Sequence, residues 1–110
     1  MPTFILTGRY SLDAVRGLMA KPEDRTEAVS AVVSAAGGTF LHYWVTTGAT
    51  DFVLVAEADR AEEFLAGVMT AAASGSVTDL TTVQAWSSPD FAKVAEKAAD
   101  MASAYRAPGD

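Results

Sequence analysis

The sequence predicts an α+β domain, in which a four-stranded antiparallel sheet carries two helices on one face. Segments rich in β-branched and aromatic residues alternate with helical segments in the order β-α-β-β-α-β. The two middle strands follow each other across a short turn, as in a hairpin. A chain of 110 residues, half of them hydrophobic, has room for one modest core. These observations together predict a ferredoxin-like fold with an additional C-terminal helix.

The first strand and an interrupted helix begin the chain. Thr3–Tyr10 has the composition of a strand, and Ser11 after it is a good N-cap for a helix. Proline is tolerated only in the first turn of a helix, so the pattern should break near Lys21. We expect a second helical segment to start over Pro22–Asp24 and to end at the glycine pair Gly37-Gly38.

The segments Thr39–Thr47 and Asp51–Glu57 predict a hairpin in the middle of the sheet. Strict alternation would direct Phe40, His42 and Trp44 to one face of the first of these strands. Both faces of the hairpin are largely apolar, so both need to be covered. Helices can cover one face. We expect a second copy of the chain to cover the other across a two-fold axis, which gives a homodimer. The alternative is a monomer whose last helix folds over the open face.

The second half of the chain predicts a helix, a strand and a final amphipathic helix. Asp59 and Glu62 have the spacing of a capping box, which predicts a helix that ends at Ser74. Val77–Trp86 is predicted as the fourth strand, and an apolar stripe at helical spacing then runs over Phe91–Tyr105. We divide the chain into a ferredoxin-like domain over residues 1–87, a C-terminal helix over 88–105 and a tail over 106–110.

Charge and composition exclude several classes of function. The net charge is −6 and no cluster of lysine or arginine is present, so neither nucleic acid nor an anionic membrane is an expected partner. The chain has no cysteine, and therefore no thiolate metal site. The N-terminus lacks the basic start of a signal peptide, and no apolar run approaches the roughly 18 residues of a membrane span. A cytoplasmic protein is expected.

His42 is the one side chain expected to titrate near neutral pH. On the helix-facing side of the sheet it could act as a catalytic general base on a phenol, an enol or an α-proton. Otherwise it is a core or interface histidine bonded to a neighbouring hydroxyl. The aromatic residues Tyr10, Phe40, Trp44 and Trp86 could line an apolar ligand pocket or could simply fill the core. Because no second ligand stands at a suitable spacing, we expect neither a metal nor another cofactor.

Several short segments resemble one known family. They are Met1-Pro-Thr-Phe-Ile5, Lys21-Pro-Glu-Asp-Arg25, Ala35-Ala-Gly-Gly38, Tyr43-Trp44, Gly48…Asp51-Phe-Val53 and Leu80-Thr-Thr-Val-Gln-Ala85. Over roughly residues 1–87 the chain resembles the GYD-domain family of small bacterial proteins. The signature Gly-x-Tyr-Asp stands here as Gly48-Ala49-Thr50-Asp51, with Thr50 in the place of the tyrosine. The resemblance implies a dimeric α+β barrel.

Three functions are compatible with these features. The first is a homodimer that binds a small apolar or aromatic ligand, or that serves as an interaction module. The second is a cofactor-independent oxygenase, isomerase or cyclase that acts on a small aromatic or polyketide-like substrate, with His42 as the base. The third is a regulatory protein that senses a metabolite. No motif in the sequence decides whether the protein is an enzyme.

Overall fold

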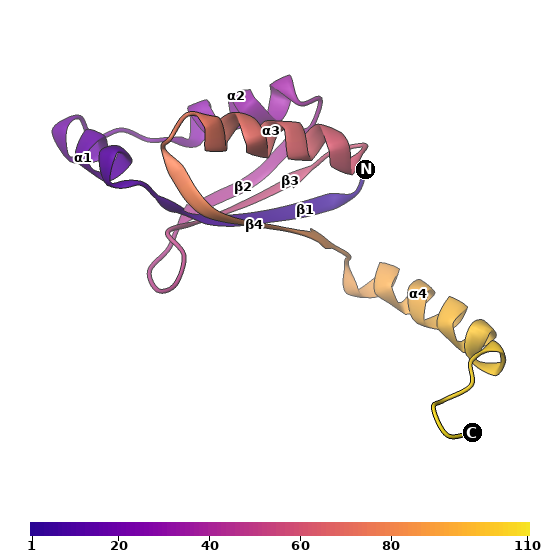
Figure 1. Ribbon diagram of the computed structural model, residues 1–110. Helices are drawn as coiled ribbons and strands as arrows, with labels where there is room; N and C mark the ends of the chain where they lie inside the picture. Colours follow the sequence, from indigo (N-terminus) through magenta and orange to yellow (C-terminus); the bar gives the residue numbers. More distant parts are fainter.

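The computed structural model describes all residues 1–110 as a sheet covered by helices, from which a C-terminal arm projects (Figure 1). One antiparallel sheet has the strand order β2-β3-β1-β4. The strands are β1 (Thr3–Tyr10), β2 (Thr39–Val45), β3 (Phe52–Glu57) and β4 (Val77–Ala85). The helices are α1 (Leu12–Ala20), α2 (Thr26–Ala35), α3 (Ala61–Ala73) and α4 (Ser88–Met101), followed by the 3₁₀ turn η1 (Ala102–Ala104). The ferredoxin-like α+β prediction is therefore confirmed.

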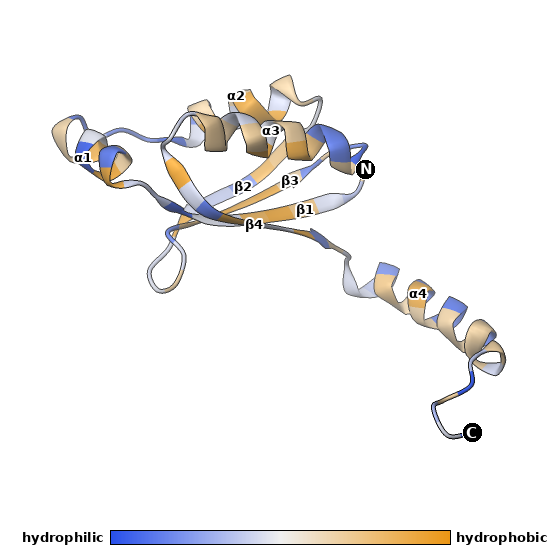
Figure 2. Cartoon of the chain, viewed as in Figure 1, coloured by the Kyte–Doolittle hydropathy of each residue, from blue (hydrophilic) through white to orange (hydrophobic).

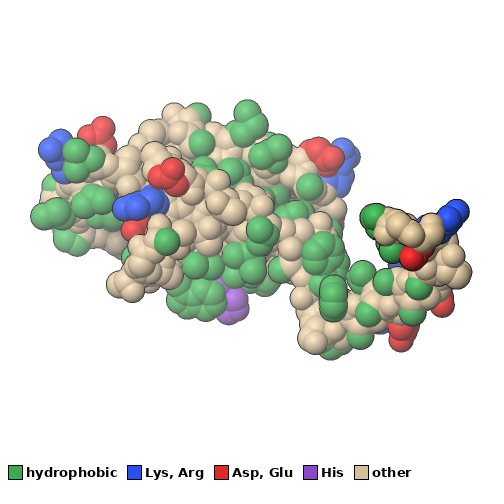
Figure 3. Space-filling model, turned by 60° about the horizontal axis from the view of Figure 1, so that its bottom comes forward, with side chains coloured by type: hydrophobic (Ala, Val, Ile, Leu, Met, Phe, Trp, Pro, Cys, Tyr) green, Lys and Arg blue, Asp and Glu red, His purple; other side chains and the backbone are tan.

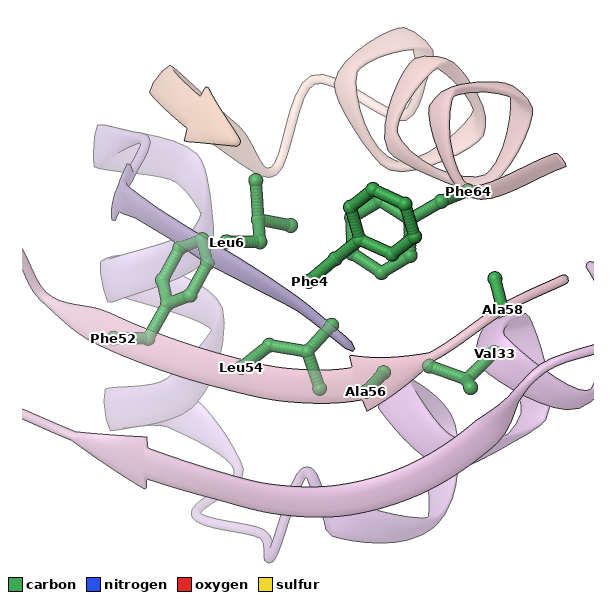
Figure 4. Close-up of a cluster of buried hydrophobic side chains, with 8 residues drawn as sticks. All are labelled: Phe4, Leu6, Val33, Phe52, Leu54, Ala56, Ala58 and Phe64. Atoms are coloured by element: carbon green, nitrogen blue, oxygen red, sulfur yellow. The ribbon is translucent and has the colours of Figure 1, made fainter. Parts of the chain in front are cut away.

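The core lies between the two central strands and the helices α2 and α3 (Figure 4). Alternate residues of β1 and β3 are buried, because they point toward the helices. The ring of Phe4 stacks on that of Phe64 in α3, with their centroids 4.8 Å apart. The buried side chains are Phe4, Leu6, Val33, Phe52, Leu54, Ala56, Ala58 and Phe64.

Two helices begin later than the sequence patterns predict. The segment Pro22–Asp24 is not helical, and α2 starts at Thr26, whose backbone N–H donates to Asp24 Oδ1 at 2.9 Å. The carboxylate of Asp24 thus holds the turn that leads into the helix. The capping box predicted at Asp59 is also wrong. The backbone of Arg60 is still extended, and α3 starts at Ala61 without a side-chain cap.

A β-bulge in β2 changes which side chains share a face. Phe40 is paired with Ala56, but the next paired residue is His42, opposite Val55, so Leu41 is an extra residue. The prediction that Phe40, His42 and Trp44 lie on one face is therefore wrong. Phe40 lies on the helix side, whereas His42 and Trp44 lie on the opposite, open face of the sheet. The same shift brings Tyr43 to the helix side.

A second irregularity lies where β1 meets β4. The register shifts between Thr7 and Arg9, and Asp79 on β4 has a positive φ of 52°. Gly8 lies at this point under two side chains. A Cβ atom there would be 2.6 Å from Leu80 Cδ2 and 2.8 Å from Phe52 Cζ. The position therefore needs glycine because the neighbouring side chains occupy the space of a side chain.

The last helix, α4, stands away from the domain on the side of the sheet opposite α2 and α3 (Figure 1). Its start agrees with the sequence, since Ser87 Oγ accepts a hydrogen bond of 3.2 Å from the backbone N–H of Asp90. None of its residues is buried, and hydrophobic and hydrophilic residues alternate along it (Figure 2). The arm gives the molecule extents of 62 × 31 × 22 Å. No helix combines the length and the apolar character needed to cross a bilayer.

Candidate functional site

A cavity of about 590 Å³ lies between the helix side of the sheet and the helices α1, α2 and α3. Most of its wall is apolar, because the strands and α2 and α3 turn their hydrophobic faces toward it. Its apolar lining includes Leu6, Leu18, Val29, Val32, Phe52, Leu54, Phe64 and Val68. Sites for small molecules typically have volumes of about 300–1,000 Å³ and walls of this kind. The cavity is therefore the candidate functional site.

Two tyrosines of the sheet bring hydroxyl groups to the wall of this cavity. The hydroxyl groups of Tyr10, at the end of β1, and Tyr43, in β2, are hydrogen-bonded to each other. Both rings pack against Phe52 between them, with centroid distances of 5.4 Å and 5.9 Å. Tyr43 reaches the cavity because the bulge at Leu41 turns it toward the helices. The pair thus forms a fixed polar spot in an apolar wall.

The phenol of Tyr43 stays protonated at neutral pH. Burial raises the pKa of Tyr43 well above its ordinary value, the hydrogen bond to Tyr10 raises it further, and the positive charge of Arg25 opposes the shift. Two hydroxyl groups carry two hydrogens, and their mutual hydrogen bond uses one. The other hydrogen is free to be donated to a ligand. The pair is thus built to donate a hydrogen bond and not to act as a phenolate base.

Asp51, in the segment that carries the family signature, holds the end of β1. Its Oδ2 accepts a hydrogen bond of 2.9 Å from the backbone N–H of Tyr10, and its own N–H donates to the carbonyl of Gly8 at 2.7 Å. The turn is closed by Thr46 Oγ1, which donates to the carbonyl of Thr50 at 2.8 Å. Asp51 therefore fixes the backbone of Tyr10 relative to the hairpin.

Charged residues of the segment between α1 and α2 form part of the cavity rim. Lys21, Glu23 and Arg25 all line it. Arg25 Nη1 lies 2.7 Å from Glu23 Oε1, so these two charges neutralise each other. Lys21 is exposed and makes no ion pair. The rim consequently carries one unpaired positive charge.

Of the five side chains predicted as site residues, only Tyr10 lines the cavity. Phe40 is half-buried and packs against the core. His42 and Trp44 lie on the open face, exposed to solvent, with their rings stacked 4.7 Å apart. Trp86 follows β4, at the opposite edge of the sheet from β2, and is also exposed. The structure therefore does not bring these aromatic residues together, and a catalytic role for His42 stays a prediction.

The sequence reasoning missed Tyr43 as a site residue, although a signal was present. A tyrosine in an otherwise apolar strand carries a hydroxyl group that needs a hydrogen-bond partner when it is buried. Tyr10 is the other tyrosine of the sheet strands, and β3 lies between the two strands that carry them. Their pairing follows from this arrangement once the bulge in β2 is known.

The sheet order and its covering helices define the protein as a ferredoxin-like α+β domain with a ligand-sized cavity. A family model described as GYD domain matches residues 4–95. The chain therefore belongs to the GYD domain family. The match extends beyond residue 87 and includes the first turns of α4.

Three solved structures are similar in fold. TTHA0845 from Thermus thermophilus is 18% identical with a TM-score of 0.51, over 80% of this chain and 96% of that chain. FFRP-DM1 is 14% identical with a TM-score of 0.49, over 78% of this chain and 100% of that chain. The hypothetical protein PHS023 from Pyrococcus horikoshii is 14% identical with a TM-score of 0.48, over 79% of this chain and 92% of that chain. No curated protein matches the chain. These likenesses concern the fold and name no activity.

Proposed function

We propose that the protein binds a small, mostly apolar molecule in the cavity between the sheet and the helices α1, α2 and α3. The observation that carries this proposal is the cavity itself, about 590 Å³ in volume and lined mainly by apolar side chains. An open apolar space of this size leaves the contacts of a packed core unmade, and an apolar ligand would restore them.

The tyrosine pair narrows the chemistry of the ligand. One hydroxyl hydrogen of Tyr10 or Tyr43 is left for a ligand, and an apolar surrounding makes an unpaired polar group costly. The ligand should therefore carry a hydrogen-bond acceptor, such as a hydroxyl or a carbonyl oxygen, at the end that lies against the tyrosine pair. The rings of Phe52 and the two tyrosines favour an aromatic body.

Binding is favoured over catalysis for a positional reason. The enzyme hypothesis used His42 as general base, and a base must lie within hydrogen-bond reach of the proton that it removes. His42 lies on the open face, across the sheet from the cavity. A substrate in the cavity would not meet it.

Gly17 allows a direct test of the cavity with naphthol, a fused aromatic ring with one hydroxyl group. Gly17 lines the cavity from α1, and a Cβ atom there would meet no other atom within 4 Å. Gly17→Leu therefore adds an apolar side chain at the cavity wall without a clash at Cβ. We expect calorimetry to show an affinity for naphthol that is lower than in the wild type by about tenfold or more, since the leucine competes for the same apolar volume.

Arg16→Leu is the matched control for this experiment. Arg16 is the preceding residue of the same helix, is exposed and does not line the cavity. This variant should bind naphthol like the wild type. Mass spectrometry should also find fewer copurifying apolar small molecules with Gly17→Leu than with the wild type or Arg16→Leu. Equal naphthol affinities for Gly17→Leu and the wild type would contradict binding in the cavity.

We also propose a homodimer in which a second copy covers the open face of the sheet. This face presents the half-buried side chains of Ile5, Val53 and Val55 together with exposed Val83 and Trp44. Figure 3 shows hydrophobic side chains gathered on this side of the domain. Apolar patches of this kind mark interaction surfaces. Light scattering at micromolar concentration should therefore give the mass of a dimer.

A further inference from the structure

The arm formed by α4 exposes an apolar stripe that its own domain leaves uncovered. The side chains of the stripe recur at helical spacing, and their exposed fractions are 59% for Phe91, 44% for Val94 and 67% for Met101. No residue of α4 is buried. An amphipathic helix gains most of its stability from packing this face against another surface. The apolar stripe of α4 is therefore expected to pack on a surface outside its own domain.

The direction of the arm indicates where this partner lies. Only Trp86 and Ser87 separate β4 from α4, so the helix continues close to the end of the edge strand. It passes to the side of the sheet opposite α2 and α3 (Figure 1). This is the side of the open face. A second copy seated on that face would lie beside the arm.

The area available on the sheet also points to a second copy that is held by the arms. A sheet whose shortest strand has 6 residues presents a face about 20 Å long and about 19 Å wide, so two faces bring together about 800 Å². Stable interfaces bury about 1,200–2,000 Å² in total. An arm of 14 residues is about 21 Å long and about 10 Å wide, so two arms and their receiving surfaces add about 800 Å². The arms bring the interface into the stable range.

The charges of the arm argue against other partners. Its polar side carries both signs, and Lys93 Nζ lies 3.9 Å from Asp90 Oδ1 on the same helix. Glu96, Lys97 and Asp100 continue the mixture. A helix for an anionic lipid surface or for nucleic acid would be basic on this side. A balanced polar side suits a helix that keeps it in water and packs its apolar side on protein.

We propose that α4 docks its apolar stripe on the second copy of the chain, so that each subunit clasps the other across the two-fold axis. The proposal rests on the pairing through the open face proposed above. In such an isologous arrangement both arms make the same contact. Each residue of the stripe therefore contributes twice to the free energy of dimerisation.

Val94→Glu tests the clasp. Val94 lies in the stripe and is already partly exposed, so glutamate leaves the helix intact and only adds a charge to the docking side. Sedimentation velocity should show a dimer dissociation constant at least about tenfold above that of the wild type. Ala92→Glu is the matched control, since it adds the same charge to the same helix beside the stripe. It should change the constant by less than about threefold.

The outcomes distinguish the clasp, in which α4 docks on the second copy, from the pairing of the two open sheet faces. A wild-type protein that is monomeric would overturn both. A Val94→Glu dimer as tight as the wild type would leave the pairing intact and overturn the clasp. Circular dichroism checks that the variant folds, and Met101→Glu, on the same stripe, repeats the test at a second position.

A second measurement shows to which copy the arm docks. The chain has no cysteine, so Lys97→Cys on the polar side accepts a single spin label. This copy, without isotopes, is mixed with an isotope-labelled copy that lacks the spin label. Line broadening in the isotope-labelled copy then reports contacts between subunits. The clasp predicts such broadening, and its absence in mixed dimers would overturn the proposal.

Discussion

Tyr43 is the residue on which the chemistry of the cavity depends most. Its hydroxyl group is bonded to that of Tyr10, and burial keeps it in the neutral form. The bulge at Leu41 turns it inward, while Asp51 fixes the backbone of Tyr10. The hydrogen-bonded tyrosine pair in the cavity wall thus depends on a bulge and on a side-chain contact that lie outside the cavity.

Tyr43→Phe should reduce the loss of stability at alkaline pH. The unfolded chain loses the phenolic proton near its ordinary pKa of about 10, whereas the folded protein keeps it to higher pH. Above about pH 10 the folded state therefore binds more protons, and the free energy of unfolding falls as pH rises. Below that pH the contribution of the protonated Tyr43 phenol to the free energy of unfolding is fully present. Urea unfolding at a series of pH values should show a shallower decline for the variant.

Tyr105→Phe serves as the control for this measurement, because Tyr105 is 73% exposed. This variant should follow the wild-type curve. If Tyr43→Phe also declines with the wild-type slope, Tyr43 does not have the raised pKa on which the neutral donor depends.

At the scale of the elements, the sequence indicated most of the strands and helices but not their irregularities. The strand over Thr3–Tyr10 and the start of α4 were predicted correctly. The bulge in β2 was not, because one extra residue leaves no clear mark in a strand with large apolar or aromatic residues on both faces. This single residue decides the faces of all the side chains after it. The aromatic cluster around His42 was misplaced for that reason.

Of the three helices that line the cavity, α1 is the most open to movement, because it contributes no buried residue, whereas α2 buries Val33 and α3 buries Phe64. Leu12 and Met19 are exposed on it, while Leu18 lines the cavity. We expect its backbone amides to exchange hydrogen faster than those of α2 and α3, since few buried contacts mean a low cost of local opening. Naphthol should slow this exchange. Protection of α1 equal to that of α3 in the free protein would contradict the prediction.

At the scale of the molecule, the sheet separates two surfaces with different proposed tasks. Its helix side encloses the cavity, and its open side meets the second copy and the arm. The sequence indicated that both faces are apolar, and the family match and the structure establish the fold. The cavity could not be predicted, because it depends on how far α1 and α2 stand from the sheet. The position of the arm could not either, since an amphipathic stripe does not specify what covers it.

Methyl-labelled NMR with naphthol tests ligand binding in the cavity most directly, because the chain carries valines on both sides of the sheet. Val29, Val32 and Val68 line the cavity, whereas Val53, Val55 and Val83 lie on the open face. The proposed function predicts that naphthol shifts the methyl resonances of the first three in a saturable way and leaves those of the other three in place. Saturable shifts confined to Val53, Val55 and Val83 would contradict it.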